Sequence, residues 1–380
     1  MSLKLSAALE QRLRLTNTAI SNRLILPIMA LAIAGSLLLP TVASAETAPE
    51  STASASTSIA STSQTASTTE TTTTTTTTTT AATTTRESNQ TRRPKIGLAL
   101  GGGGARGAAH VGVLRILERE GIHVDMIAGT SVGAIVGGMY CAGLSVDEIE
   151  KQFTRPHLMR SYMTAPIWMS VVAQPIFLIP RIVGWRPYDG FYFGNKFRNY
   201  YRRCLPKDRH NIEDLNIPFR AMTTNLVDGQ QFVVDHGDLP RAIQASSAIP
   251  VLRRAVGLSE DQVLVDGAVL VNVPVDEVRK MGADIVIAVS VSEHLETVPG
   301  KNFKKIGSVG RRLEQIFLSH TDTAQMAHSD LIIHPRTDNI GILSTDARDA
   351  KRGIKAGEEA ATETIPAIRQ KIESFKGNNP

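Results

Sequence analysis

Cysteine is scarce in this chain of 380 residues, and this scarcity limits the kinds of site that the chain can hold. Its two cysteines, Cys141 and Cys204, lack the spacing of a metal site. An oxidising compartment would permit them to pair, but Cys141 lies in a run of small residues that predicts a buried helix, so we expect a free thiol there. No cysteine stands after the apolar segment near the N-terminus, where a lipid-anchored precursor would carry one.

Net charge is also small, which argues against a nucleic-acid partner. The formal charge is +5, of which residues 1–45 contribute +3 through four basic residues and one acidic residue, leaving +2 for the rest. Domains that bind nucleic acid carry a strong basic patch or stripe instead. The sequence also shows no calcium-binding loop and no cluster of metal ligands, so we expect neither a metal nor another cofactor.

The first quarter of the chain is expected to lie outside the folded domain. Residues 24–39 form a mostly apolar run that follows four basic residues and precedes Ala43-Ser44-Ala45, a pattern typical of a secretory signal peptide. We predict a signal peptide over 1–45 and an exported protein, periplasmic or secreted, while membrane association and an uncleaved anchor stay open. Residues 46–92 are dominated by Ser, Thr and Ala and have no core to bury, which predicts a disordered linker.

The remaining residues alternate between strand-like and helix-like patterns. The apolar run 94–100 predicts a buried strand, and apolar residues at helical spacing predict a helix over 108–120. Alternation of this kind predicts an α/β fold in which a mostly parallel sheet is covered by helices on both faces. We place the core of the domain at 93–300 and expect 301–380 to be a C-terminal helical and strand extension packed on the same domain.

Two glycine-rich turns lie at the ends of predicted strands. The loop Gly101–Gly107 directly follows the first strand, and Gly129-Thr130-Ser131-Val132-Gly133 lies between a strand at 126–128 and a helix at 132–143. A serine on a sharp strand-to-helix turn projects from the backbone, and flanking glycines give it room. Because open α/β sheets place their sites at the carboxyl ends of strands, Ser131 is a candidate nucleophile.

A serine hydroxyl needs a base, and the best-placed candidate is Asp266. It ends the apolar strand 262–265 and is followed by Gly267-Ala268. If this strand ran parallel to the one before Ser131, the carboxylate and the hydroxyl would lie on the same rim of the sheet. Partial burial there would raise the pKa of Asp266 and make it a better proton acceptor. A Ser-His-Asp triad with a late histidine such as His334 is the alternative.

The order of these motifs resembles the patatin-like phospholipase family, serine lipid acyl hydrolases that work with a Ser-Asp dyad. The matching motifs are Gly102-Gly103-Gly104-Ala105-Arg106-Gly107, Gly129-Thr130-Ser131-Val132-Gly133, Ala245-Ser246-Ser247-Ala248-Ile249-Pro250, Asp266-Gly267-Ala268 and Asn272-Val273-Pro274. They extend from about Lys95 to Ser290. Each motif is weak alone, but the ordered set is specific, and it implies a patatin-like three-layer fold.

The resemblance also implies roles for single residues. Ser131 would attack an ester carbonyl to form a covalent acyl-enzyme, and Asp266 would take its proton and later activate water. The backbone N–H groups of Gly102, Gly103 and Gly104 would form the oxyanion hole, at roughly 3 to 4 kcal/mol for each well-placed donor. Arg106 and Gly107 belong to the same oxyanion and substrate-binding loop, where we expect Arg106 to hold the loop or pair with a carboxylate. Gly129, Gly133 and Gly267 are the glycines of the other motifs.

Other functions fit parts of the sequence. Gly102-x-Gly104-x-x-Gly107 also resembles a dinucleotide-binding loop, but that fold requires an acidic residue at the far end of the second strand, where this chain has Gly129-Thr130-Ser131. Residues 156–188 combine apolar residues with Trp and Arg, which predicts either peripheral membrane contact or an ordinary core segment. An inactive module that binds lipid or a partner there is a further alternative. The expected substrate is a phospholipid or another acyl-ester lipid; acyl chain, head group and oligomeric state stay open.

Overall fold

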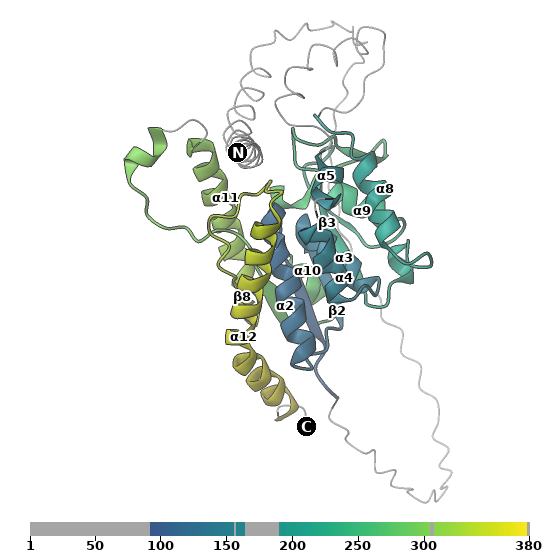
Figure 1. Cartoon of the computed structure of the whole chain (residues 1–380). Coiled ribbons are helices and arrows are strands. Elements are labelled where there is room, and N and C mark those ends of the chain that lie inside the picture. The colour runs from purple at the N-terminus through teal and green to yellow at the C-terminus, as the bar shows by residue number, and fades with distance from the viewer. Residues whose placement is uncertain (1–91, 156, 164–189, 305–307, 378–380) are drawn as a thin grey trace, which may run out of the picture.

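The computed structural model of the chain describes residues 92–155, 157–163, 190–304 and 308–377 (Figure 1). The predicted signal peptide lies outside the described residues, as do nearly all of the predicted linker and most of the segment 156–188. The described ranges form an eight-stranded sheet between two layers of helices.

The strands form one mixed sheet in the order β5-β6-β3-β2-β1-β7-β8, and β4 pairs with β3 off this path. In chain order they are β1 Ile96–Leu100, β2 Met126–Thr130, β3 Phe219–Asn225, β4 Gln231–Val234, β5 Val256–Ser259, β6 Gln262–Asp266, β7 Ile285–Val289 and β8 Leu331–Ile333. The pairs among β3, β2, β1, β7 and β8 are parallel. The pairs β3–β4, β3–β6 and β5–β6 are antiparallel. The predicted mostly parallel sheet is confirmed, and it carries an antiparallel edge.

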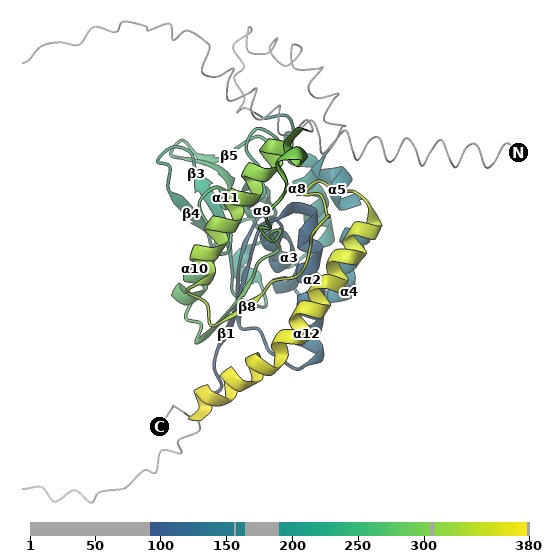
Figure 2. The ribbon, with the colours of Figure 1, turned by 90° about the vertical axis from the view of Figure 1, so that its left-hand side faces the viewer.

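Helices cover both faces of the sheet. They are α2 Ala108–Arg119, α3 Val132–Cys141, α4 Val146–Thr154, α5 His157–Tyr162, α8 Asn195–Cys204, α9 Leu239–Ser246, α10 Val275–Lys280, α11 Ser308–Met326 and α12 Ala347–Gly377, with 3₁₀ turns η1 Gly104–Gly107, η2 Ile212–Asp214, η3 Gly267–Val269 and η4 Gly300–Lys304. Helices α10 and α11 lie on one face, and α2, α3 and α12 lie on the other (Figure 2). The three-layer arrangement predicted from the sequence is therefore present.

Alternate residues of the buried strands supply the two halves of the core. Along β1, Leu98 and Leu100 belong to the larger apolar cluster with α2 and α3, whereas Ala99 belongs to the smaller cluster with α10. The α10 side is tightly packed, because a Cβ atom on Gly97 would lie 2.2 Å from Cγ1 of Val278. Small residues in β1 thus let α10 lie close against the sheet.

The C-terminal helix α12 packs lengthwise against α2 (Figure 2). The two backbones approach closely at glycines: a Cβ atom on Gly357 would lie 2.0 Å from the carbonyl oxygen of Ala109, and one on Gly112 would lie 2.0 Å from that of Ile354. Side chains at either glycine would force the helices apart. Among the described helices, none combines the length and the apolar character needed to cross a bilayer.

Candidate active site

Ser131 lies at a strained turn between β2 and α3. Its backbone has φ 53° and ψ −118°, a conformation that residues other than glycine rarely adopt. The residue is 6% exposed. Room for the turn comes from its neighbours: a Cβ atom on Gly133 would lie 2.1 Å from the carbonyl oxygen of Leu100, and one on Gly129 would lie 2.6 Å from the amide nitrogen of Ala134. The local sequence thus fixes a serine that projects from the end of β2.

The side chain of Ser131 meets that of Asp266. Ser131 Oγ donates a hydrogen bond to Asp266 Oδ2 at 2.7 Å, and the amide of Ala268 donates to Asp266 Oδ1 at 2.9 Å. Burial of the carboxylate raises the pKa of Asp266 to about 6, opposed by these two hydrogen bonds and by the positive charge of Arg253. The carboxylate is therefore ionised at neutral pH and can accept a proton.

Asp266 reaches this position by an antiparallel route, which differs from the parallel strand considered in the sequence analysis. β3 is parallel to β2, with Thr130 opposite Met222, and then continues past the end of β2. β6 returns along this extension in the antiparallel sense, with Asp266 opposite Thr223. The last residue of β6 is thus level with the residue after β2. The assumed strand direction was wrong, but the two side chains do converge on one rim.

The glycine loop after β1 presents backbone amides near Ser131. The amide of Gly102 already donates to Asn272, at 3.1 Å to its side-chain oxygen. Within the described residues, by contrast, the amides of Gly103 and Gly104 have no acceptor. Gly104 lines the same pocket as Ser131 and has φ 59°, and a Cβ atom there would lie 2.3 Å from the carbonyl oxygen of Ile342. Only glycine fits this position without displacing the chain.

The remaining motif residues hold the loops. Arg106 is 2% exposed and donates hydrogen bonds to Glu293 at 2.6 Å and to a backbone carbonyl at 2.9 Å. Gly107 lets α3 approach, since a Cβ atom there would lie 2.2 Å from Val132. Gly267 lies against the backbone of β3, where a Cβ atom would be 2.6 Å from a carbonyl oxygen. These residues shape the site and do not line the pocket beside Ser131.

A buried polar chain links the glycine loop to α11. Asn272, which accepts the amide of Gly102, donates to Asp322 Oδ1 at 2.7 Å. Asp322 Oδ2 accepts the hydroxyls of Ser290 at 2.6 Å and Ser292 at 2.5 Å. Asp322 is 2% exposed. No sequence motif marked this aspartate, because its role depends on where α11 packs.

The histidines of the described ranges make no hydrogen bond to Ser131 or Asp266. His334, the base of the alternative triad, bonds to the backbone oxygen of Ser292 at 3.0 Å. His110 bonds to a carbonyl of the glycine loop, and burial lowers its pKa to about 4. The geometry therefore favours the carboxylate as the partner of the serine.

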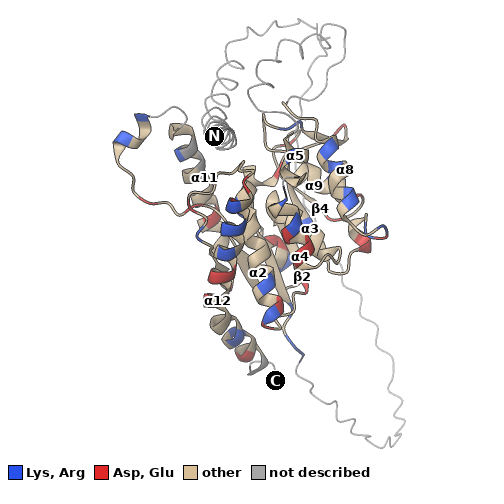
Figure 3. Cartoon of the chain, viewed as in Figure 1, with Lys and Arg blue, Asp and Glu red and all other residues tan. Residues whose placement is uncertain are grey.

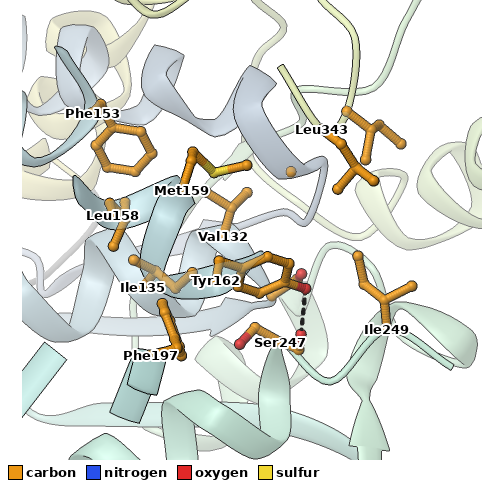
Figure 4. A pocket seen from close by; sticks show the side chains of 13 residues that line it. Val132, Ile135, Phe153, Leu158, Met159, Tyr162, Phe197, Ser247, Ile249 and Leu343 are labelled. Carbon is orange, nitrogen blue, oxygen red and sulfur yellow. Dashed lines mark hydrogen bonds between the residues drawn. The ribbon is translucent and has the colours of Figure 1, made fainter. Parts of the chain in front are cut away.

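An apolar pocket lies beside Ser131 (Figure 4). Its lining comes from α3, α4, α5, α8, the segment after α9 and the loop before α12: Gly104, Ser131, Val132, Ile135, Phe153, Leu158, Met159, Tyr162, Phe197, Ser247, Ile249, Ile342 and Leu343. Tyr162 is fixed by a 2.7 Å hydrogen bond from its hydroxyl to the carbonyl oxygen of Ser247. The described part of the segment 156–188, which is α5 and Met163, thus contributes to the wall of this pocket.

A buried arginine near the pocket, Arg253, was not predicted from the sequence. Arg253 is 1% exposed, and its guanidinium lies over the rings of Tyr162 and Phe197, 4.2 Å and 4.7 Å from their centroids. It has no hydrogen-bond partner among the described residues. Two residues earlier, Val251 adopts φ 67°, an unusual value for a β-branched residue. Desolvation lowers the pKa of Arg253, and the charge of Asp266 opposes that shift.

Part of the sequence matches known proteins. Residues 98–279 match the sequence model of the family described as Patatin-like phospholipase. These residues form a patatin-like phospholipase domain. The chain is 33% identical over 207 residues to Lysophospholipase NTE1 of Scheffersomyces stipitis, covering 54% of this chain and 12% of that protein. It is 36% identical over 203 residues to Patatin-like phospholipase domain-containing protein 7 of Rattus norvegicus, covering 53% and 14%.

The chain thus spans only a small share of the length of these curated relatives. Among solved structures, VipD from Legionella pneumophila is similar with a TM-score of 0.43 and 15% identity, covering 73% of this chain and 67% of that chain. The patatin-like domain contains Ser131 and Asp266, whereas Asp322 lies beyond the matched segment.

Among the described residues, no group of three or more His, Cys, Asp or Glu side chains could hold a metal ion. Cys141 and Cys204 are both free thiols.

Proposed function

We propose that this chain hydrolyses carboxylic esters of lipids, as a phospholipase or lysophospholipase, with Ser131 as nucleophile and Asp266 as general base. The observation that carries the proposal is the 2.7 Å hydrogen bond between the two side chains, beside an apolar pocket. The patatin-like domain and the lysophospholipase among its relatives support the class of reaction. The substrate is a phospholipid or another acyl-ester lipid.

In the proposed acylation step, Asp266 accepts the hydroxyl proton of Ser131 while Oγ attacks the carbonyl carbon of the ester. The carbonyl oxygen becomes an oxyanion in the tetrahedral intermediate. When the intermediate collapses, the carbon–oxygen bond to the alcohol breaks, and the departing alkoxide takes the proton from Asp266. The products are a free alcohol and an acyl group bound to Ser131 Oγ.

Deacylation repeats these steps with water in place of the serine hydroxyl. Asp266 accepts a proton from water, and the resulting hydroxide attacks the acyl carbon. Collapse of the second intermediate breaks the bond to Ser131 Oγ, which regains the proton held by Asp266. The fatty acid leaves and the dyad returns to its starting state.

The amides of Gly103 and Gly104 are the proposed oxyanion donors. They lie in the loop beside Ser131 and have no acceptor within the described part of the chain. Two such donors suit the charge that develops on the carbonyl oxygen. Gly102 was expected to be a third donor, but its amide is held by Asn272, so we assign it to holding the loop. The positive end of α3, which begins at Val132, supports the same charge.

The apolar pocket is the proposed site of the acyl chain. Its lining is almost entirely aliphatic and aromatic (Figure 4), and Ser131 is part of that lining. An acyl chain held there would lose contact with water while its ester carbon lies against Ser131.

We also propose that the chain is exported and that the segment 156–188 contacts the membrane from which the substrate comes. Sequencing the N-terminus of the mature protein tests the proposed export, and we expect the mature protein to start at Glu46.

Steady-state hydrolysis of a soluble short-chain ester and of a lysophospholipid tests the proposal. We expect Ser131→Ala and Asp266→Asn each to lower kcat/KM by at least about 1000-fold, because each removes a group that acts on the reacting atoms. Matched controls are Ser259→Ala and Asp276→Asn, exposed residues away from the pocket, which should keep wild-type rates.

Two outcomes would contradict the proposal. If Asp266→Asn kept full activity while His334→Asn lost it, the base would be a histidine and the dyad would be wrong. If the wild-type chain cleaved no ester while still binding lipid, the alternative of an inactive binding module would replace the hydrolase.

A further inference from the structure

One face of α11 carries exposed apolar side chains one turn apart. Val309, Leu313 and Phe317 are 54%, 61% and 52% exposed, and their spacing of four places them in a row along the helix. Further along the same helix, Asp322 and Met326 are buried at 2% and 9% against the sheet. The C-terminal part of α11 is therefore packed on the sheet, while this apolar row is exposed to solvent.

The row lies at the end of the molecule where Ser131 lies. Asp322 bonds to Ser292, just past the carboxyl end of β7. The C-terminal part of α11 is thus anchored at the rim. Ten residues nearer the N-terminus of the helix, Arg312 donates a hydrogen bond to the backbone oxygen of Glu296, which lies in the loop after β7. The first half of α11 therefore extends beyond the rim on which Ser131 and Asp266 meet (Figure 1).

Positive charge flanks the apolar row. The turn η4, which contacts α11, carries Lys301 and Lys304, both exposed, and Phe303, which is 36% exposed. The Lys and Arg positions of η4 and of the upper part of α11, blue in the ribbon, lie at the same end of the molecule (Figure 3). Among the described residues of η4 and of the loop between β7 and η4, Lys301 and Lys304 are exposed cations and Glu296 is an exposed carboxylate, so the described exposed charge there is net positive.

We propose that this surface docks the protein on an anionic lipid bilayer, and the proposal rests on the proposed function insofar as the substrate is a bilayer lipid. The surface, named the α11 face, consists of Lys301, Phe303, Lys304, Val309, Leu313 and Phe317. Apolar side chains in a row on a helix, bordered by lysines, are typical of helices that lie in the headgroup region. Docking in this way turns the rim with Ser131 toward the lipid.

A second copy of the chain fits this face less well than a bilayer does. A two-fold contact places the same surface of both copies together, so the lysines of η4 would lie near their own counterparts. Anionic lipid headgroups neutralise the same lysines. The charge therefore selects the bilayer as the occupant.

The experiment places an environment-sensitive label on the α11 face. Leu313→Cys is labelled with the fluorophore NBD in the full chain, in a Cys204→Ser background, since Cys204 is half-buried whereas Cys141 is fully buried. Ser131→Ala is included so that lipid is not hydrolysed. The matched control is His123→Cys, whose side chain is 67% exposed and which precedes β2, at the end of the sheet opposite Ser131. Vesicles contain phosphatidylcholine alone or mixed with phosphatidylglycerol.

We expect the label at 313 to shift to shorter wavelength with vesicles and to be quenched by brominated lipid. Both effects should grow with phosphatidylglycerol and weaken at high salt, since the lysines attract anionic headgroups through a screened interaction. The label at 123, at the opposite end of the sheet, should remain in water. In a chain without the label, Leu313→Ser/Phe317→Ser should lower vesicle binding by about tenfold or more.

The proposal is overturned if the label at 313 stays in water when the chain is bound to vesicles, or if the chain binds neither kind of vesicle. It is also overturned if the label shifts without vesicles as protein concentration rises, since this would make the face a contact between copies. Hydrolysis of a soluble ester by Leu313→Ser/Phe317→Ser at the wild-type rate separates docking from catalysis. Equal melting temperatures of the variants exclude unfolding as the cause.

Discussion

At the scale of single residues, the proposed chemistry depends on a carboxylate that is buried yet mostly ionised at neutral pH. Burial at 3% exposure disfavours the ionised form of Asp266 and raises its pKa to about 6. Hydrogen bonds from Ala268 and Ser131 and the charge of Arg253 favour the ionised form and limit this rise. A base with a pKa just below neutral is mostly ionised at pH 7 and still binds a proton well.

The pH dependence of kcat/KM follows from this balance. Asp266 acts as a base only when it is ionised, so the rate should be constant well above pH 6 and fall about tenfold per pH unit well below it. Arg253 lowers the pKa of Asp266, so Arg253→Met should raise that pKa and move the acidic limb to higher pH. The measurement is a pH–rate profile with a soluble ester.

The control for this prediction is Arg254→Met, in which the lost charge comes from the neighbouring residue, whose guanidinium lies over the ring of Phe193. Its acidic limb should stay near that of the wild type. An Arg253→Met profile that coincides with the wild-type profile would show that the buried guanidinium does not act on Asp266. Since Arg253 has no hydrogen-bond partner in the described ranges, its replacement by an apolar side chain should not destabilise the fold strongly.

At the scale of elements, α11 fixes the glycine loop through Asn272. Asp322→Ala would leave the side chain of Asn272 and the hydroxyls of Ser290 and Ser292 without their acceptor. We expect the free energy of unfolding to fall by roughly 2 to 4 kcal/mol. We also expect kcat to fall about tenfold or more with little change in KM, because the proposed oxyanion donors lose their position.

The measurement is kcat per active site, with sites counted by fluorophosphonate titration. Asp322→Asn keeps the shape and one oxygen acceptor, so it should recover part of the loss. If each folded molecule of Asp322→Ala turned over at the wild-type rate, Asp322 would serve stability alone.

Local elements were predictable because their signals are local. Ser145 and Glu148 form a capping box at the start of α4, Asp238 caps α9, and Asp228-Gly229 lies in the turn between β3 and β4. Each is a sequence pattern typical of that local structure. The direction of β6 was not predictable, because β6 pairs with a part of β3 that extends past β2, and no local pattern encodes such pairing. The predicted strands at 126–128 and 262–265 nevertheless end within two residues of β2 and β6, and for that reason the prediction that Ser131 and Asp266 share one rim agrees with the structure.

The roles of Arg253 and Asp322 show the limit of motif reading. Arg253 lies in a segment whose backbone is strained at Val251, and its position between two rings arises only when α5 and α8 pack together. Asp322 lies some 50 residues beyond Asn272, its partner in the site. Long-range packing decides both contacts, so neither residue stood out in the sequence.

At the scale of the whole molecule, the folded unit is larger than the segment that matches the family. The match ends at residue 279, whereas α11 holds the site and α12 packs along α2. The close packing of α12 on α2 at Gly357 therefore contributes to the stability of the folded unit.

Gly357→Ala tests this contact. A Cβ atom would lie 2.0 Å from the carbonyl oxygen of Ala109, and the overlap should outweigh the better helix propensity of alanine. We expect a loss of roughly 1 to 3 kcal/mol in the free energy of unfolding, measured by urea denaturation. Gly300→Ala is the control, since no atom lies within 4 Å of the added Cβ there. A Gly357→Ala protein as stable as the wild type would mean that α12 is not tightly packed on α2.

The most direct test of the account is to map the residue that a fluorophosphonate labels and to measure the labelling rate. The account predicts a single adduct on Ser131 at neutral pH, a rate that falls as the pH drops below about 6, and loss of labelling in both Ser131→Ala and Asp266→Asn. Labelling of another serine, or labelling of Asp266→Asn at the wild-type rate, would contradict the claim that these two side chains form the catalytic pair.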